Sequence, residues 1–257
     1  MIRVERPEPG IALVTFDRPQ ARNALTFEMW AQLRACAGEL DGDDSLRCVV
    51  FTGAGEAAFV SGTDIGAFTA FANGDDGLAY EKRVEAAIDA LSHLRVPAIA
   101  AIRGACTGGG ASIAASCDVR IGGPGTRVGI PIARTLGNTI SLRNIARLAA
   151  LIGLDAARAL LLTGTLLDSA DAYRLGFLGE VVGSDEEVLP RALEAARGIA
   201  GLAPLTVRAS KALALRLLEA QRLPDDADLL RACYGSNDFR EGVAAFVARR
   251  PPHWTGS

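Results

Sequence analysis

The sequence reads Ala105-Cys106-Thr107-Gly108-Gly109-Gly110-Ala111-Ser112 at the point that most constrains its fold. The apolar segment 98–102 before it predicts a buried strand, and the small residues 111–116 predict a helix. Glycine lets a backbone approach a ligand closely because it has no Cβ atom. The N–H groups that begin a helix lack partners within it, and the helix dipole favours negative charge there. This stretch therefore predicts a turn that can offer backbone N–H groups to an electron-rich atom.

A second loop of the same kind lies nearer the N-terminus. It reads Phe59-Val60-Ser61-Gly62-Thr63-Asp64-Ile65 and comes after the strand predicted at 48–52. Two such loops side by side would place two N–H donors on one oxygen, as a thioester carbonyl needs when it becomes an enolate. The alternative for the three glycines is tight packing of a strand against a helix. The spacing fits neither a dinucleotide-binding fingerprint nor a P-loop.

The composition is that of a globular chain of 257 residues, long enough to bury a core without a disulfide or a structural metal. The net charge of −3 argues against nucleic acid as a general partner. The five cysteines are odd in number and lack zinc-like spacing, which predicts free thiols in a reducing cytoplasm and no metal site. We expect neither a secretion signal nor a membrane span, because no apolar stretch is long enough.

Hydrophobic periodicity predicts strands alternating with helices first and helices alone later, which indicates an α/β core with a helical C-terminal part. Thr26 is a predicted N-cap, and Phe27 and Trp30 would lie on the core face of the helix that follows. The predicted strands are 11–16, 48–52, 98–102, 119–121 and 127–130. The predicted helices are 27–40, 78–94, 111–116, 142–152, 155–162, 169–175, 186–199, 205–220 and 239–248.

Seven short segments carry a further signal through their order and spacing. The first three read Arg18-Pro19-Gln20-Ala21-Arg22-Asn23-Ala24-Leu25, Ser61-Gly62-Thr63-Asp64-Ile65 and Gly104-Ala105-Cys106-Thr107-Gly108-Gly109-Gly110. The later four are 117–120, 162–164, 170–176 and 238–246. Together they resemble the successive signatures of the crotonase (enoyl-CoA hydratase/isomerase) family. The resemblance spans nearly the whole chain, and seven motifs in order are far more specific than one.

The resemblance implies a crotonase spiral of ββα units, with the spiral core and acyl-CoA site in residues 1–200. Residues 201–257 would form a helical trimerisation region, giving a homotrimer or a dimer of trimers. The substrate would be an acyl-CoA thioester, with coenzyme A as part of the substrate and no tightly bound cofactor. No nucleic-acid or membrane partner is implied.

The resemblance also assigns individual positions. The oxyanion donors would be the backbone N–H groups of Thr63 and Gly109. Positions that would contact coenzyme A are Arg22, Ala24, Ser61, Asp64 and Ile65. Arg22 could pair with a phosphate of coenzyme A, or it could be a solvated loop arginine. An Asp that opens a helix after a turn, as Asp64 does, is more often a cap than a catalytic group.

The sequence departs from the family at the two glutamates that hydratases of this family use on water. Ser112 and Ile132 occupy those two positions. Between Asp89 and Asp155 the sole acidic residue is Asp118, whose surroundings in the motif suggest a structural role. A positioned acid or base contributes roughly 10²–10⁴-fold, so ordinary enoyl-CoA hydration should be slow.

Replacements for the missing glutamates are few. A nucleophilic Ser112 facing the site would need a base within reach, and the two histidines, His93 and His253, are expected to be surface or capping groups. Cys106 is expected to be a small buried thiol. Arg134, Asn138 and Thr139 could reach the acyl group from the loop after Pro131, and an inward Arg134 would favour a substrate with a second carboxylate.

These observations leave three functional hypotheses open. The first is an enoyl-CoA hydratase/isomerase-family enzyme in which hydration is weak. The second is isomerase- or decarboxylase-type enolate chemistry, for which enolate stabilisation matters most. The third is a catalytically silent acyl-CoA-binding protein. A nucleic-acid-binding relative is a more distant alternative, opposed by the acidic net charge.

Overall fold

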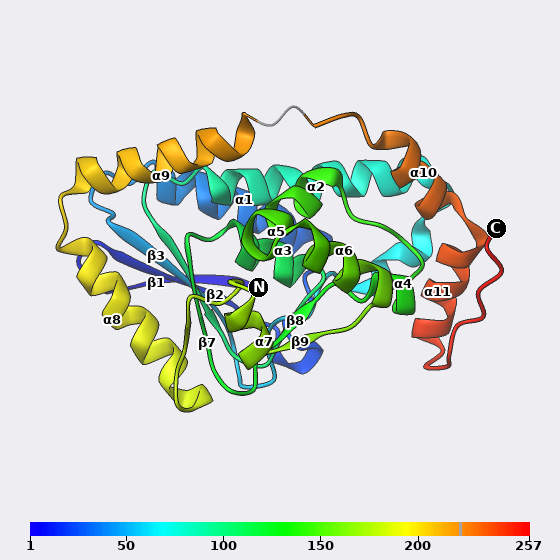
Figure 1. Ribbon diagram of the computed structural model, residues 1–257, viewed down its shortest axis with the longest axis horizontal. Coiled ribbons are helices and arrows are strands. Elements are labelled where there is room, and N and C mark those ends of the chain that lie inside the picture. The colour runs from blue at the N-terminus through cyan, green and yellow to red at the C-terminus, as the bar shows by residue number, and fades with distance from the viewer. Residues whose placement is uncertain (221–222) are drawn as a thin grey trace.

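The computed structural model describes residues 1–220 and 223–257 and has an α/β architecture with two sheets (Figure 1). The six-stranded sheet has the order β1-β2-β3-β5-β7-β10, and the four-stranded sheet has the order β4-β6-β8-β9. The first comprises β1 (Ile2–Glu8), β2 (Ile11–Phe16), β3 (Cys48–Gly53), β5 (Ala98–Ile102), β7 (Val119–Gly122) and β10 (Glu180–Val181). The second comprises β4 (Ala58–Val60), β6 (Ala105–Thr107), β8 (Arg127–Gly129) and β9 (Leu167–Asp168).

Successive strands of the central region alternate between the two sheets. β3, β5 and β7 pair in parallel in one sheet, while β4, β6 and β8 pair in parallel in the other. Each of these strand pairs is followed by a helix, namely α2 (Gly74–Ser92), α3 (Gly109–Ser116) and α4 (Ile132–Thr135). The repeated unit is therefore strand, strand, helix, which confirms the α/β class and the predicted spiral.

The remaining helices lie mostly in the second half of the chain. They are α1 (Phe27–Asp41), α5 (Leu142–Ile152), α6 (Leu154–Thr163), α7 (Ser169–Arg174), α8 (Val188–Ala200), α9 (Pro204–Glu219), α10 (Ala227–Gly235) and α11 (Asn237–Val247). Three 3₁₀ turns are η1 (Pro19–Ala21), η2 (Ile65–Ala70) and η3 (Asp185–Glu187). Thr26 caps α1, as predicted, by accepting a hydrogen bond from the Met29 N–H at 3.2 Å.

The sequence patterns found the buried elements and missed several exposed or short ones. Strands 11–16 and 98–102 and helix 142–152 have the predicted bounds. The prediction omitted β1, whose residues are exposed except at its ends, because it lacks a buried face. It also omitted α10 and the two- or three-residue strands β4, β6, β9 and β10, because such short strands show no period. Residues 105–107 of the predicted turn form β6 instead.

Two hydrophobic clusters hold these layers together. The larger one fills the space between the sheets and helices α1, α2 and α3, and the smaller one lies between the six-stranded sheet and α8. In the smaller cluster Val188, Ala192 and Ala196 pack against the sheet, four residues apart along one face of α8. Figure 1 shows α8 covering that side of the sheet.

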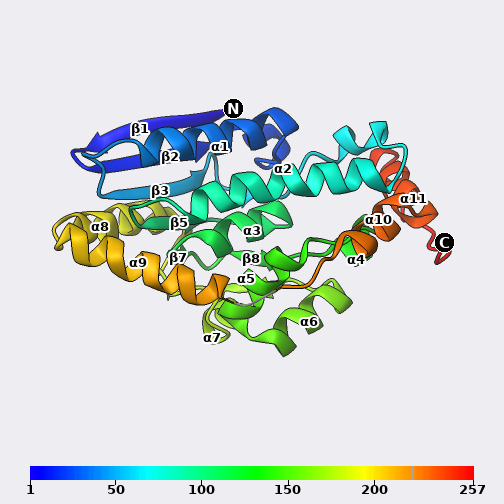
Figure 2. The same ribbon diagram turned by 90° about the horizontal axis from the view of Figure 1, so that it is seen from above.

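The last part of the chain contributes three helices. α9 has no buried residue, whereas α10 and α11 pack against α2 and η2 at the far end of the molecule (Figure 2). The expected division at residue 200 falls at the end of α8, and it remains a prediction. None of the helices in the described ranges is long and apolar enough to cross a membrane.

The turn that precedes α1 is held by a buried asparagine. Asn23 is fully buried and lies at a φ of +56°, a left-handed conformation that Asn tolerates better than most residues. Its Oδ1 accepts from the Arg18 N–H at 3.0 Å, and its Nδ2 donates to the carbonyls of Ala54 at 2.9 Å and Ala58 at 2.7 Å. One side chain therefore ties the 18–25 turn to the segment joining β3 and β4.

We expect Asn23→Ala to lower the free energy of unfolding by about 1–3 kcal/mol, because it leaves buried carbonyls without a donor. Chemical denaturation monitored by circular dichroism measures the change. Asn237→Ala is the matched control: Asn237 is exposed, so its replacement should stay within about 0.5 kcal/mol. Equal effects of the two replacements would contradict this role of Asn23.

Candidate functional site

Two glycine-bearing loops meet at one edge of the four-stranded sheet. β4 and β6 are neighbouring parallel strands, so the loops that follow them leave the sheet at the same edge. Thr63 lies three residues after β4, and Gly109 begins α3 two residues after β6. The loops touch directly, because a Cβ atom added to Gly108 would lie 3.5 Å from the Gly62 Cα. The structure therefore brings together the two loops that the sequence singled out.

The amides of Thr63 and Gly109 are open for a ligand. In residues 1–220 and 223–257 neither N–H donates to a protein acceptor. Gly108 has a φ of +54°, a conformation that residues with side chains rarely adopt, and it immediately precedes the Gly109 amide. Its own N–H is used internally, donating to the Gly129 carbonyl at 2.9 Å.

Both loops line a cavity of about 100 Å³. Apolar side chains supply much of its wall, and a small number of polar groups converge on it, as in ligand sites generally. The apolar lining consists of Ile65, Phe68, Pro131, Ile132, Leu136 and Ile140. The lining with polar side chains consists of Ser61, Thr63, Tyr80, Glu81, Thr107, Thr135, Asn138 and Tyr234.

Trp30 braces the two loops from behind. Its Nε1–H donates to Thr63 Oγ1 at 3.0 Å, and its ring lies so close to Gly109 that an added Cβ would be 2.7 Å from Trp30 Cζ2. Tyr80 completes the brace with a 2.6 Å hydrogen bond between its hydroxyl and Thr63 Oγ1. Burial raises the pKa of the Tyr80 hydroxyl, which stays protonated. Sequence analysis placed Trp30 in the core correctly and missed this contact with the site.

The positions assigned to coenzyme A lie on two adjoining segments. The Ser61 N–H donates to the Arg22 carbonyl at 3.2 Å, and the Leu25 N–H donates to the Gly62 carbonyl at 2.8 Å. Arg22 is exposed at a φ of +50°, and Ala24, Ser61 and Ile65 are half-buried. The two segments are therefore adjacent: Ser61 and Ile65 line the cavity, and Arg22 is exposed to solvent.

Asp64 is a cap, as its place in the sequence suggested. Its Oδ1 accepts from the Gly66 N–H at 3.1 Å at the start of η2, and its carboxylate pairs with Arg18 at 2.7 Å. The same residue thus joins the 18–25 turn to the loop after β4.

The two positions where the family has glutamates differ in their surroundings. Ile132 begins α4 and lines the cavity. Ser112 is buried within α3 and lies outside the described lining, although it was expected to face the site. Asn138 lines the cavity, whereas Arg134 is exposed, so the condition for a second-carboxylate substrate is not met.

The other candidate groups have structural roles. Asp118 accepts from the Ala98 N–H and from Lys211 Nζ, each at 2.7 Å. His93 ends α2 and pairs with Glu219 at 3.1 Å, while the His253 N–H donates to Glu241 in the tail. Cys106 is fully buried, and burial raises the pKa of its thiol. None of these four residues lines the described cavity.

Sequence reasoning missed one acidic group, Glu81 on α2. Glu81 is 4% exposed and lines the cavity. Its Oε1 accepts from the Tyr234 hydroxyl at 2.6 Å, and its Oε2 accepts from the Ser141 N–H at 3.3 Å. Burial raises its pKa to about 7, against the lowering effect of these two hydrogen bonds. A signal was available: Leu78, Glu81 and Val84 recur at a spacing of three, which puts a carboxyl on a buried helix face.

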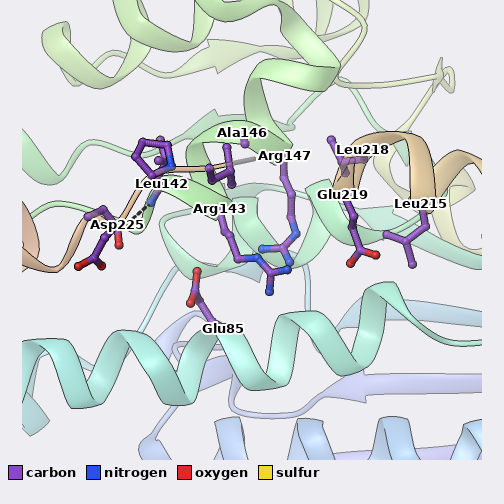
Figure 3. Close-up of a pocket in the computed structure, with 12 residues that line it drawn as sticks. Glu85, Leu142, Arg143, Ala146, Arg147, Leu215, Leu218, Glu219 and Asp225 are labelled. Atoms are coloured by element: carbon purple, nitrogen blue, oxygen red, sulfur yellow. Dashed lines mark hydrogen bonds between the residues drawn. The ribbon is translucent and has the colours of Figure 1, made fainter. Parts of the chain in front are cut away.

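A larger cavity of about 510 Å³ lies elsewhere, between α2, α5 and α9 (Figure 3). Figure 3 shows Arg143 and Arg147 side by side, with Glu85 reaching toward them from α2. Both arginines already pair with Asp89 on the same helix as Glu85. Both guanidinium groups are thus already engaged with a carboxylate, and no glycine-bearing loop lines this space. We therefore assign the functional site to the smaller cavity.

Comparison with known proteins agrees with this geometry. The family model for enoyl-CoA hydratase/isomerase matches residues 6–257. A short-chain-enoyl-CoA hydratase from Clostridium acetobutylicum is 32% identical over 246 residues, covering 95% of this chain and 93% of that protein.

Two solved structures are similar over most of the chain. A methylmalonyl-CoA decarboxylase aligns with a TM-score of 0.89 and 25% identity, covering 100% of this chain and 98% of its own. A monofunctional enoyl-CoA isomerase from M. smegmatis aligns with a TM-score of 0.72 and 30% identity, covering 86% and 95%. With its paired loops and its ββα spiral, this chain belongs to the enoyl-CoA hydratase/isomerase, or crotonase, family.

Proposed function

We propose that this enzyme binds an acyl-CoA thioester and stabilises the enolate formed from it. The observation that carries the proposal is the meeting of two loops whose Thr63 and Gly109 amides have no internal acceptor in the described chain and line one cavity. Two N–H donors on the thioester oxygen would stabilise the negative charge that develops there. Because they are backbone groups in loops held by packed strands and by α3, they need no reorganisation when that charge appears.

Coenzyme A would lie along the two adjacent segments that carry Arg22, Ala24, Ser61 and Ile65. The exposed Arg22 guanidinium would pair with a phosphate of coenzyme A. In this proposal coenzyme A is part of the substrate, and the chain uses no tightly bound cofactor.

Hydration should be a weak activity of this enzyme. The two family glutamate positions hold Ser112 and Ile132, and an isoleucine side chain can neither activate nor protonate water. Isomerisation or decarboxylation depends more on the enolate than on a pair of groups acting on water. The similar proteins include an isomerase and a decarboxylase by name as well as hydratases, which supports keeping these reactions open.

We expect crotonyl-CoA hydration to be at least about 10²-fold slower than in a family hydratase with both glutamates, because positioned acids and bases contribute that much. Loss of the enoyl absorbance measures the rate. The same preparation should convert 3-enoyl-CoA, or decarboxylate a malonyl-type thioester, measurably. Hydration at the rate of the comparison hydratase would contradict the proposal, and binding without any turnover would favour a silent acyl-CoA-binding protein.

Trp30→Phe should reduce kcat about fivefold, the effect of losing roughly 1 kcal/mol of hydrogen bonding to Thr63. The phenyl ring still fills part of the core, so KM should change by less than about twofold. Steady-state kinetics on the preferred thioester measures both constants. Trp254→Phe, in the C-terminal tail, is the control and should leave them unchanged. An unaltered kcat in Trp30→Phe would show that the brace is not needed.

We further propose that the chain assembles as a homotrimer or a dimer of trimers through its C-terminal helices. In α9 no residue is buried, and Leu205, Leu213 and Leu217 are 62% to 79% exposed. Burying such a row of leucines against another copy removes apolar surface from water.

The five free cysteines support the expected location in the reducing cytoplasm.

The double replacement Leu213→Glu and Leu217→Glu should convert the assembly to a monomer of 26.8 kDa, because charges would then lie in the interface. Light scattering coupled to size-exclusion chromatography measures the mass. Val4→Glu on β1, also an exposed apolar position, should leave the oligomer intact. A wild-type monomer would refute the proposed assembly.

A further inference from the structure

One carboxyl group reaches the cavity from an element that the family signatures do not include. Glu81 lies in the middle of α2, and it is the sole acidic side chain among the described residues that line the cavity. The neighbouring Tyr80 holds Thr63, so the same turn of helix supports an oxyanion loop and presents a carboxyl to the space beside it. A reacting acyl chain held by that loop would lie in reach of this turn.

The hydrogen bonds of Glu81 leave part of its carboxyl free. A carboxylate can accept about four hydrogen bonds, and in the described chain Glu81 accepts two, both from uncharged donors. No ion pair to Glu81 forms in residues 1–220 and 223–257. A nearly buried carboxyl that serves only structure is usually paired with a cation. Glu81 therefore has unused hydrogen-bond acceptors in a buried position, where an unsatisfied acceptor costs free energy.

Two consecutive hydrogen bonds orient the Glu81 carboxyl. Asn138 Nδ2 donates to the Tyr234 oxygen at 2.9 Å, and the Tyr234 hydroxyl donates to Glu81 Oε1 at 2.6 Å. The Tyr234 hydroxyl donates its single hydrogen to the Glu81 carboxyl. Tyr234 therefore orients Glu81 and does not compete with it for a proton of the substrate. Tyr234 reaches this position because Gly77 on α2 has no side chain: an added Cβ would lie 2.1 Å from Tyr234 Cγ.

The groups that act on the Glu81 carboxyl are either acidic or uncharged. Glu85 on α2 and Asp226, just before α10, add negative charge, which favours the protonated form of Glu81. The nearby arginines Arg143 and Arg147 are paired with Asp89 instead. Tyr80, Tyr234 and Asn138 are uncharged, so burial prevails and the carboxyl titrates near neutral pH. A catalytic acid–base group works best when its pKa lies near the pH at which the enzyme operates.

We propose that Glu81 is the catalytic acid–base group of this site, moving a proton between the carbons of an unsaturated acyl thioester, with Tyr234 as its positioning residue. This inference rests on the proposed enolate function and assigns its missing base. It also favours isomerisation, because one carboxyl can take a proton and return it without water.

The step balances within the substrate and one side chain. The Glu81 carboxylate takes a proton from the α-carbon of a 3-enoyl thioester. The C–H electron pair forms a double bond between the carbonyl carbon and the α-carbon, and the carbonyl π pair moves onto the thioester oxygen, which gives a dienolate. The negative charge moves to the thioester oxygen, held by the Thr63 and Gly109 amides. The protonated Glu81 then returns the proton to the γ-carbon, and the double bond ends between the α- and β-carbons. No oxidant, reductant or water is consumed.

The deciding experiment compares wild type with Glu81→Gln. The probe is but-3-enoyl-CoA in D₂O, followed by NMR for isomerisation and for deuterium at the α- and γ-carbons. We expect both rates to fall about 10²–10⁴-fold while the Kd for butyryl-CoA changes less than about threefold. Glu85→Gln, one turn along α2 and outside the cavity, should keep the wild-type rate at pH 8 within about twofold.

The pH profile gives a second readout that a structural role would not move. Because the base is the carboxylate, kcat/KM for wild type should rise with pH through a midpoint near 7. Tyr234→Phe removes a hydrogen bond that lowers this pKa, so its midpoint should move to higher pH while the plateau is largely kept. Glu81→Asp should retain a pH-dependent fraction of the rate even if Glu81→Gln folds poorly.

Stability provides a check that the variants are folded. The pKa of Glu81 is raised in the folded state. Its contribution to the free energy of unfolding is therefore fully present below about pH 4.5 and is lost as pH rises through about 7. Glu81→Gln should therefore flatten the dependence of Tm on pH across that window.

The outcomes separate the two proposals. If wild type neither binds butyryl-CoA nor exchanges protons, the proposed function fails. If wild type exchanges protons and Glu81→Gln does so at the same rate, only the role of Glu81 is overturned. Binding without exchange in wild type also overturns it, because no proton is then transferred.

Discussion

The parallel pairing of β4 with β6 is the constraint on which the site depends. Since both strands run the same way in one sheet, the turns that follow them must emerge together. The turns then come into contact through glycines: Gly62 and Gly108 lie against each other, and Gly110 lies so near Val60 that a Cβ would be 2.0 Å from its carbonyl oxygen. Side chains at these positions would push the loops apart. Glycine is thus needed here for approach as well as for conformation.

Around the paired loops, buried polar groups are satisfied by one another, which fixes their positions. Trp30 and Tyr80 both bond to the Thr63 hydroxyl, and Tyr234 links Glu81 to Asn138. Aromatic rings surround these groups, so an unmade hydrogen bond would be expensive and alternative arrangements are disfavoured. The same low polarity raises the pKa of Glu81 to about 7.

Helix α2 connects the two halves of this arrangement. It starts at a complete capping box on Asn73, packs against α1, and receives α10 at Gly77 (Figure 2). The C-terminal segment therefore completes the cavity with Tyr234, while α9 remains exposed. The chain uses its last helices in different ways: α10 lines the cavity through Tyr234, α11 packs against η2, and α9 leaves an apolar surface open.

The sequence by itself determined the α/β class, the two glycine-bearing loops and the absence of glutamates at positions 112 and 132. These are local properties, carried by hydrophobic period, by glycine runs and by motif order. Only the tertiary structure placed Trp30 between Thr63 and Gly109, showed Arg134 pointing to solvent, and brought Glu81 together with Tyr234, 153 residues away. Contacts between distant segments depend on how whole helices pack, and a local pattern cannot say which buried face will meet which cavity.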